Sequence, residues 1–213
     1  MEELVWHEQW DVNRRLRDLG LSIDVLQDAA KAGYLARASC TPNDPPMTPG
    51  TDAWSRTVRR LRELLIARGW RKDDPGNYSL TISDEHRLNV VVASGDEATG
   101  QRATMPRTKS PKGIYTALAV ERNLHPDLFP ETLPEAVRKA PLTLQYPTWM
   151  FLILIEESAV HAELSYPSEI EDGHVTKWKE RIILPSFGVD PAEIDDGPAD
   201  FGPDFDVDVQ RKA

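Results

Sequence analysis

The chain has 213 residues, of which 35 are acidic and 25 are basic, so its formal net charge is −10. With 40% hydrophobic residues, this length suits one globular domain or two small ones and excludes a wholly disordered chain. No apolar run approaches the roughly 20 residues of a bilayer-spanning helix, so we expect no membrane segment. A single cysteine, Cys40, excludes an intrachain disulfide framework. No secretory signal is evident, and we expect a cytoplasmic protein.

The first forty residues predict two helices. Apolar residues recur at helical spacing over residues 5–19, and Gly20 supplies a stop. Ser22 is a suitable N-cap for a second helix that reaches Leu35.

A third helix follows a proline-rich connector at residues 41–52. We expect Thr51 or Asp52 to cap this helix and Gly69 to end it. Its apolar positions share one face, which leaves an exposed face rich in arginine. The arginines on that face are Arg56, Arg59 and Arg60.

Beyond the third helix the apolar pattern changes to the period of two that is typical of strands. The expected strands cover residues 80–82, 88–92, 149–155, 160–166 and 175–184. Two short helices are expected between the second and third of these strands. Because neighbouring strands are joined by short links, the sequence predicts an α+β fold with a mostly antiparallel sheet of about five strands and N-terminal helices on one face.

This pattern divides the chain into two parts. Residues 1–188 are predicted to form a single α+β domain, helical over 1–69 and rich in strands over 77–185. Residues 189–213 are predicted to be a flexible tail rich in acids, proline and glycine. Residues 190–213 hold eight acids and two bases, more than half of the net negative charge.

The basic loop, residues 102–112, is the first candidate site. Its prolines favour an extended backbone, and its cations alternate with hydroxyl residues, a composition suited to phosphate groups. The predicted contacts to nucleic acid or another polyanion come from this loop and from the third helix: Arg56, Arg59, Arg60, Arg102, Arg107, Lys109 and Lys112. The alternative is a solvated loop whose cations pair with the chain's own acids.

The acidic tail is the second candidate site. Phe201 and Phe205 alternate there with Asp204 and Asp206, a pattern that could place a ring in a partner's apolar pocket while carboxylates meet a basic rim. The tail could also fold back on the basic loop, or serve only to keep the protein soluble.

A carboxylate-rich metal site is a third possibility. Asp96 and Glu97 lie in a loop, and His161 and Glu163 lie two apart on a predicted strand, so the latter two face the same way. Oxygen donors of this kind suit Mg²⁺ or Mn²⁺, and Asp96, Glu97 and Glu163 would then act in a phosphodiesterase or nuclease. The alternative is that these residues have no metal-binding role and form only a polar strand face and an ordinary acidic turn.

The sequence therefore favours a non-enzymatic binding module that engages nucleic acid or another polyanion through the basic loop and a protein partner through the tail. It needs no cofactor in this interpretation. The alternatives are a metal-dependent phosphodiesterase or nuclease and a structural subunit of a larger assembly, in which the six tryptophans could serve interfaces.

Overall fold

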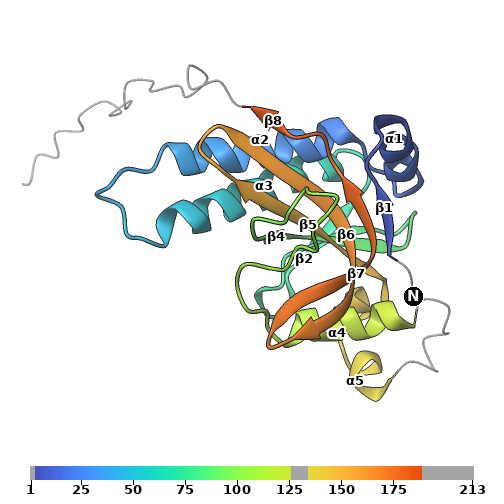
Figure 1. The fold of residues 1–213 in the computed structure, drawn as a ribbon. Helices are drawn as coiled ribbons and strands as arrows, with labels where there is room; N and C mark the ends of the chain where they lie inside the picture. The colour runs from blue at the N-terminus through green and yellow to red at the C-terminus, as the bar shows by residue number, and fades with distance from the viewer. Residues whose placement is uncertain (1–2, 126–133, 189–213) are drawn as a thin grey trace, which may run out of the picture.

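The computed structural model describes residues 3–125 and 134–188, and its ribbon is shown in Figure 1. Within these residues one sheet contains eight strands: β1 (Leu4–Trp6), β2 (Arg71–Asp73), β3 (Leu80–Ser83), β4 (Leu88–Ser94), β5 (Thr148–Ile155), β6 (Ala159–Glu171), β7 (His174–Ile183) and β8 (Phe187–Gly188). The strand order is β1-β7-β6-β5-β4-β3-β2, and β8 pairs with β6. Only β1–β7 and β4–β5 are parallel, so the prediction of a mostly antiparallel sheet is confirmed.

The predicted number of about five strands is too low. The three additional strands, β1, β2 and β8, are two or three residues long and lie at edges of the sheet. A period of two cannot be recognised over so few residues, which is why the sequence pattern missed them.

Helices lie on both sides of the sheet. They are α1 (Gln9–Asp18), α2 (Ile23–Ala38), α3 (Thr48–Ile66), α4 (Ile114–Leu124) and α5 (Glu135–Arg138), with short 3₁₀ turns at Pro75–Asn77 and Leu142–Gln145. The N-terminal helices α1, α2 and α3 pack on one face, as predicted, and α4 and α5 lie on the other side (Figure 1).

Alternation along the central strands builds a separate core on each face of the sheet. Phe151 and Ile153 of β5 point toward α1, α2 and α3, where they join buried side chains such as Leu26. Met150 and Leu152 of the same strand point the opposite way, into the core that α4 covers. The continuous apolar run of β5 therefore reflects a strand that is buried on both faces.

The N-terminal end of the domain differs from the prediction. The first helix was expected to begin at Val5, but residues 4–6 form β1, which runs parallel to β7 in the register Val5 to Arg181. The indole N–H of Trp6 donates to Glu180 on β7 at 2.7 Å and fixes this edge strand. Three residues paired to a strand far along the chain leave no local signal.

The third helix begins at Thr48, earlier than predicted, and includes Pro49 in its first turn. A proline is tolerated there because the first N–H groups of a helix have no partner within the helix. The connector between α2 and α3 is therefore shorter than the proline content suggests.

Helices α2 and α3 approach each other closely at Gly33, which has no side chain to separate them. A Cβ at this position would meet the hydroxyl of Thr57 and the carbonyl of Ala53 on α3. The contact is fixed further because Thr57 is buried and donates its own hydroxyl to the Ala53 carbonyl at 2.8 Å.

Gly33→Ala should lower the free energy of unfolding by about 1–3 kcal/mol, because the added methyl group forces the helices apart. Gly50→Ala is the matched control. A Cβ at Gly50, also in a helix, would meet no atom within 4 Å. That change should therefore stabilise the protein by about 0.5–1 kcal/mol. Urea unfolding of both variants measures the difference, and equal effects would contradict the close approach.

Candidate functional site

A fully buried ion pair joins β6 to β7 beneath the connection between β4 and α4, residues 95–113. Glu163 and Arg181 are 0% and 1% exposed. The guanidinium donates to both carboxylate oxygens, at 3.0 Å from Nε and 2.6 Å from Nη2. Glu163 also accepts the Ser165 hydroxyl at 2.7 Å and the backbone N–H of Gly100 at 2.9 Å. Every charge in this pair is therefore met by a hydrogen-bond partner.

The same arginine holds the backbone of the connection. Arg181 Nη1 donates to the carbonyl of Thr104 at 2.8 Å, and Nη2 donates to the carbonyl of Gln101 at 3.0 Å. Together with the Gly100 contact, these bonds fix the start of the basic loop against the sheet.

The end of the basic loop is fixed by bonds to β4 and β7. Thr108 forms an isolated antiparallel bridge with Gly95, and its N–H donates to the Val175 carbonyl at 3.1 Å. Trp178 donates its indole N–H to the Pro106 carbonyl at 2.8 Å. The backbone N–H of Lys112 donates to the Gly173 carbonyl at 2.6 Å. The basic loop is thus held at both ends by its backbone, and the side chains of Arg102, Arg107 and Lys109 are left exposed.

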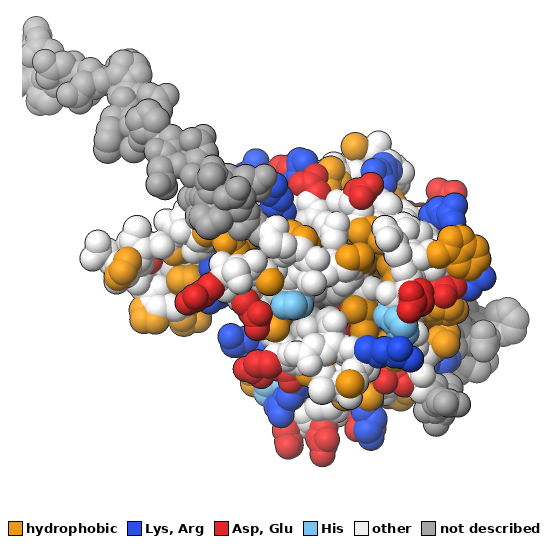
Figure 2. Space-filling view, turned by 45° about the horizontal axis from the view of Figure 1, so that its top comes forward, with side chains coloured by type: hydrophobic (Ala, Val, Ile, Leu, Met, Phe, Trp, Pro, Cys, Tyr) orange, Lys and Arg blue, Asp and Glu red, His pale blue; other side chains and the backbone are white. Residues whose placement is uncertain are grey.

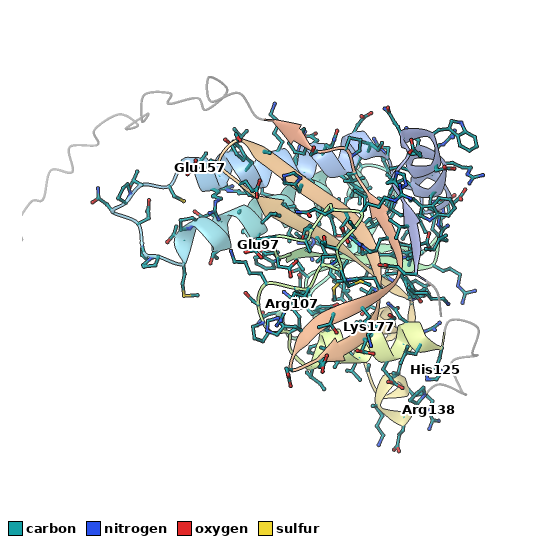
Figure 3. The ribbon with its side chains drawn as sticks, viewed as in Figure 1. Glu97, Arg107, His125, Arg138, Glu157 and Lys177 are labelled. Atoms are coloured by element: carbon teal, nitrogen blue, oxygen red, sulfur yellow. The ribbon has the colours of Figure 1, made fainter. Side chains whose placement is uncertain are left out.

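The predicted cations of the loop fall into two groups. Arg102, Arg107 and Lys109 are exposed, and none of them forms an ion pair with another described residue. Figure 3 labels Arg107 and Glu97, which both belong to the connection between β4 and α4. Lys112 is largely buried, also without a carboxylate partner among the described residues, and burial lowers the pKa of its ammonium below the ordinary value.

Most arginines of α3 form ion pairs with acidic residues of the same chain. Arg59 Nε lies 2.8 Å from Glu63, and Arg60 Nη2 lies 2.8 Å from Asp28 on α2. Arg56 is exposed and has no such pair within the described residues. Figure 2 likewise shows acidic and basic side chains interspersed over one face of the molecule. The structure does not place the α3 arginines with the lysines of the basic loop.

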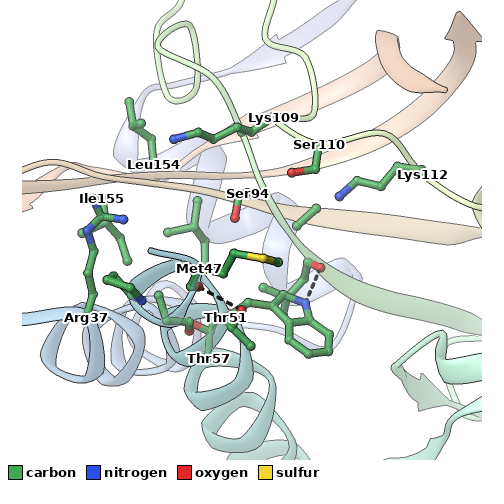
Figure 4. A pocket seen from close by; sticks show the side chains of 18 of the residues that line it. Arg37, Met47, Thr51, Thr57, Ser94, Lys109, Ser110, Lys112, Leu154 and Ile155 are labelled. Carbon is green, nitrogen blue, oxygen red and sulfur yellow. Dashed lines mark hydrogen bonds between the residues drawn. The ribbon is translucent and has the colours of Figure 1, made fainter. Parts of the chain in front are cut away.

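Lys109 and Lys112 instead line an open pocket of about 650 Å³ together with Arg37, the last-turn cation of α2 (Figure 4). We call it the cationic pocket. Its floor is formed by the ends of β4 and β5, and one wall by the start of α3 with Met47 and Trp54. Hydroxyl groups line it as well, from Thr51, Thr57, Ser94 and Ser110.

The charge balance of this pocket is one-sided. Its lining contains three cations and no aspartate or glutamate. The first turn of α3 lies in the same wall, so the positive end of that helix dipole adds to the cations. The pocket can therefore hold an anionic group and, against Met47 and Trp54, an apolar or aromatic one.

Sequence reasoning missed Arg37, Met47 and Trp54 as site residues. No sequence motif marks any of these three residues as part of a site. Their meeting depends on the close pairing of α2 with α3, which no local pattern predicts.

The residues of the predicted metal site do not converge. Glu163 is bound by Arg181, Glu97 is exposed, and His161 lies 3.3 Å from Glu156 instead. Asp96 accepts the backbone N–H groups of Ala98 and Arg107, each at 3.2 Å, and so shapes its own turn. Among the described residues no three His, Cys, Asp or Glu side chains are grouped as a metal ion requires.

The predicted partner-binding residues Phe201, Phe205, Asp204 and Asp206 lie outside the described residues. In the part of the chain that is described, no helix has the length and apolar character to cross a membrane. Comparison with protein-family models, with curated proteins and with solved structures gives no match to this chain.

Glu163→Gln should lower the free energy of unfolding by about 3–5 kcal/mol, because it removes the carboxylate that binds the buried Arg181 guanidinium and leaves only the more distant Glu3, 3.7 Å away. Glu169→Gln is the control: Glu169 pairs with Lys177 at the surface, where such pairs contribute less than about 1 kcal/mol. Urea unfolding measures both losses. Equal, small losses would show that the buried pair does not hold the connection.

Lys112→Met should raise the free energy of unfolding at neutral pH, on the order of 1 kcal/mol, because it removes a poorly solvated charge. Since the folded pKa of Lys112 is lowered, its penalty is complete below that pKa and fades as the pH rises toward the ordinary 10.5. The stability gap between variant and parent should therefore close over that interval. Lys139→Met, at an exposed surface pair with Glu135, should change stability little at any pH. A stability loss in Lys112→Met would contradict this account.

Proposed function

We propose that the chain is a binding module that holds nucleic acid or another polyanion at the cationic pocket and the adjoining basic loop. The observation that carries the proposal is that Arg37, Lys109 and Lys112 line one pocket that has no acidic residue in its lining. Such a set of donors neutralises phosphate groups and releases their counterions.

The fixed backbone of the basic loop supports this proposal. Arg181 and Thr108 hold the loop in one conformation before any ligand arrives. Little ordering entropy is then lost when the lysines meet an anion, which favours affinity.

The destabilising effect of the Lys112 charge on the fold also supports the proposed function. A charge that is largely removed from water without a counter-charge destabilises the fold, and sites of this kind are typical of functional positions. An anionic ligand would supply the missing counter-charge.

The metal-dependent phosphodiesterase or nuclease has no comparable support, because its central ligand Glu163 is already bound by Arg181. No observation favours the structural subunit over the binding module. The protein partner of the acidic tail and the cytoplasmic location stay predictions.

The test uses the full chain and a fluorescently labelled oligonucleotide, with anisotropy read at increasing salt. Binding at low salt should weaken steeply as salt rises. Changing Lys109 and Lys112 to alanine together should reduce the salt slope by roughly 1.4 for a single strand, at about 0.7 per lost phosphate contact. The affinity itself should fall at least about tenfold at low salt.

The control is the double change of Lys139 and Lys177 to alanine, which removes the same charge from two exposed lysines that pair with Glu135 and Glu169. This variant should keep the parent's affinity and slope. If the parent binds no polyanion at low salt, or both double variants lose affinity equally, the proposed function is wrong.

A further inference from the structure

A second pocket, of about 580 Å³, adjoins the cationic pocket at Trp54. Trp54 lines both, and it is the one residue among the described linings that they share. The second pocket is formed along α3 by Val58 and Ile66 and is bordered by Lys72 at β2. A ligand that leaves the cationic pocket along α3 therefore passes over this indole ring.

The Trp54 ring is both accessible and fixed. It is 37% exposed, although large apolar side chains are usually buried. Its N–H donates to the carbonyl of Val92 on β4 at 3.2 Å, which ties the ring to the sheet. The neighbouring Ala53, Thr57 and Val58 are buried, so the helix cannot turn to hide the ring. A ring held in this way keeps its orientation when a flat ligand group stacks on it.

The two pockets differ in their free charge. In the second pocket Arg59 and Arg62 are paired with Glu63 and Asp74, at 2.8 and 2.7 Å. The cationic pocket has no acid in its lining. Lys72 is the one cation of the second pocket without an ion pair among the described residues, whereas the cationic pocket has three such cations. We therefore expect most phosphate contacts in the cationic pocket.

We infer that the ligand of the cationic pocket is single-stranded nucleic acid, with its phosphates at Arg37, Lys109 and Lys112 and an unpaired base stacked on Trp54. This inference rests on the proposed function and names its ligand class. A cationic groove interleaved with an aromatic platform is the arrangement that binds single strands, since each unpaired base offers a flat face. A duplex keeps its base faces covered, and inorganic polyphosphate has none.

The contributions of the lysines and of the Trp54 ring to the affinity can be separated by varying the salt concentration. The lysines act on charge, so their loss should reduce the salt slope. The ring acts by stacking, so its loss should lower affinity by a similar factor at low and high salt.

The experiment measures anisotropy of a labelled twelve-nucleotide thymidine strand with the full chain, and competition by the matching duplex and by inorganic polyphosphate. The parent should bind the single strand at least about tenfold more tightly than either competitor. Trp54→Ala should lower single-strand affinity about tenfold with the salt slope unchanged. Trp54→Phe, which keeps a ring but loses the bond to Val92, should recover most of that affinity.

Trp10→Ala is the matched control, because Trp10 is 67% exposed on α1 and lies outside both pocket linings. It should leave affinity unchanged. Thermal unfolding of each variant shows whether Trp54→Ala remains folded, and recovery by Trp54→Phe distinguishes stacking from a folding defect.

Two failures can be told apart. This inference is wrong if single strand, duplex and polyphosphate bind equally and Trp54→Ala keeps the parent's affinity. In that case, loss of binding in the Lys109 and Lys112 double variant would still support the proposed function. If none of the three polyanions binds at low salt, the proposed function fails and the inference fails with it.

Discussion

The buried pair of Glu163 and Arg181 determines where the connection between β4 and α4 can lie. Removing two charges from water is costly, and this pair offsets the cost only because hydroxyl, amide and carbonyl groups complete its hydrogen bonds. Three of those bonds go to the backbone at Gly100, Gln101 and Thr104. The pair therefore contributes specificity: a long segment with little secondary structure of its own takes one path across the sheet. The position of Lys109 and Lys112 follows from that path.

The basic side chains of this molecule differ in whether a carboxylate of the same chain neutralises them. Arg181 is fully buried with a carboxylate, and Arg59, Arg60 and Arg62 are paired at the surface. The cationic pocket differs from these pairs, because its lining offers no acid to Lys112. In a chain whose net charge is −10, an acid-free cluster of cations is not explained by composition alone. Its local field opposes that of the whole chain, which makes binding of an anion more dependent on short-range contact than on long-range attraction.

The sequence predicted what local periodicity can encode. The hairpin of β3 and β4, the buried strand β5 and the amphipathic third helix each show their own apolar spacing, and the structure contains all three. The shared face of His161 and Glu163 followed from the period of two, but the pattern could not tell that the connection covers Glu163. Burial of a charged strand residue depends on a partner 18 positions away, Arg181. The pocket was missed for the same reason, since Arg37, Trp54 and Lys109 come from three separate segments.

The topology explains why the pocket forms where it does. The sheet is mostly antiparallel, but β4 and β5 run parallel, because the chain crosses the sheet through the basic loop and α4 before it returns as β5. Parallel strands end at the same edge, and the connections that leave there open a crevice beyond their carboxyl ends. Ser94 and Gly95 at the end of β4, with Ile153 to Ile155 at the end of β5, form the floor of the cationic pocket. The close approach of α2 and α3 at Gly33 then brings Arg37 and Trp54 to its walls. A single parallel pairing, a buried ion pair and one glycine contact are thus sufficient to assemble a site from residues with no common motif.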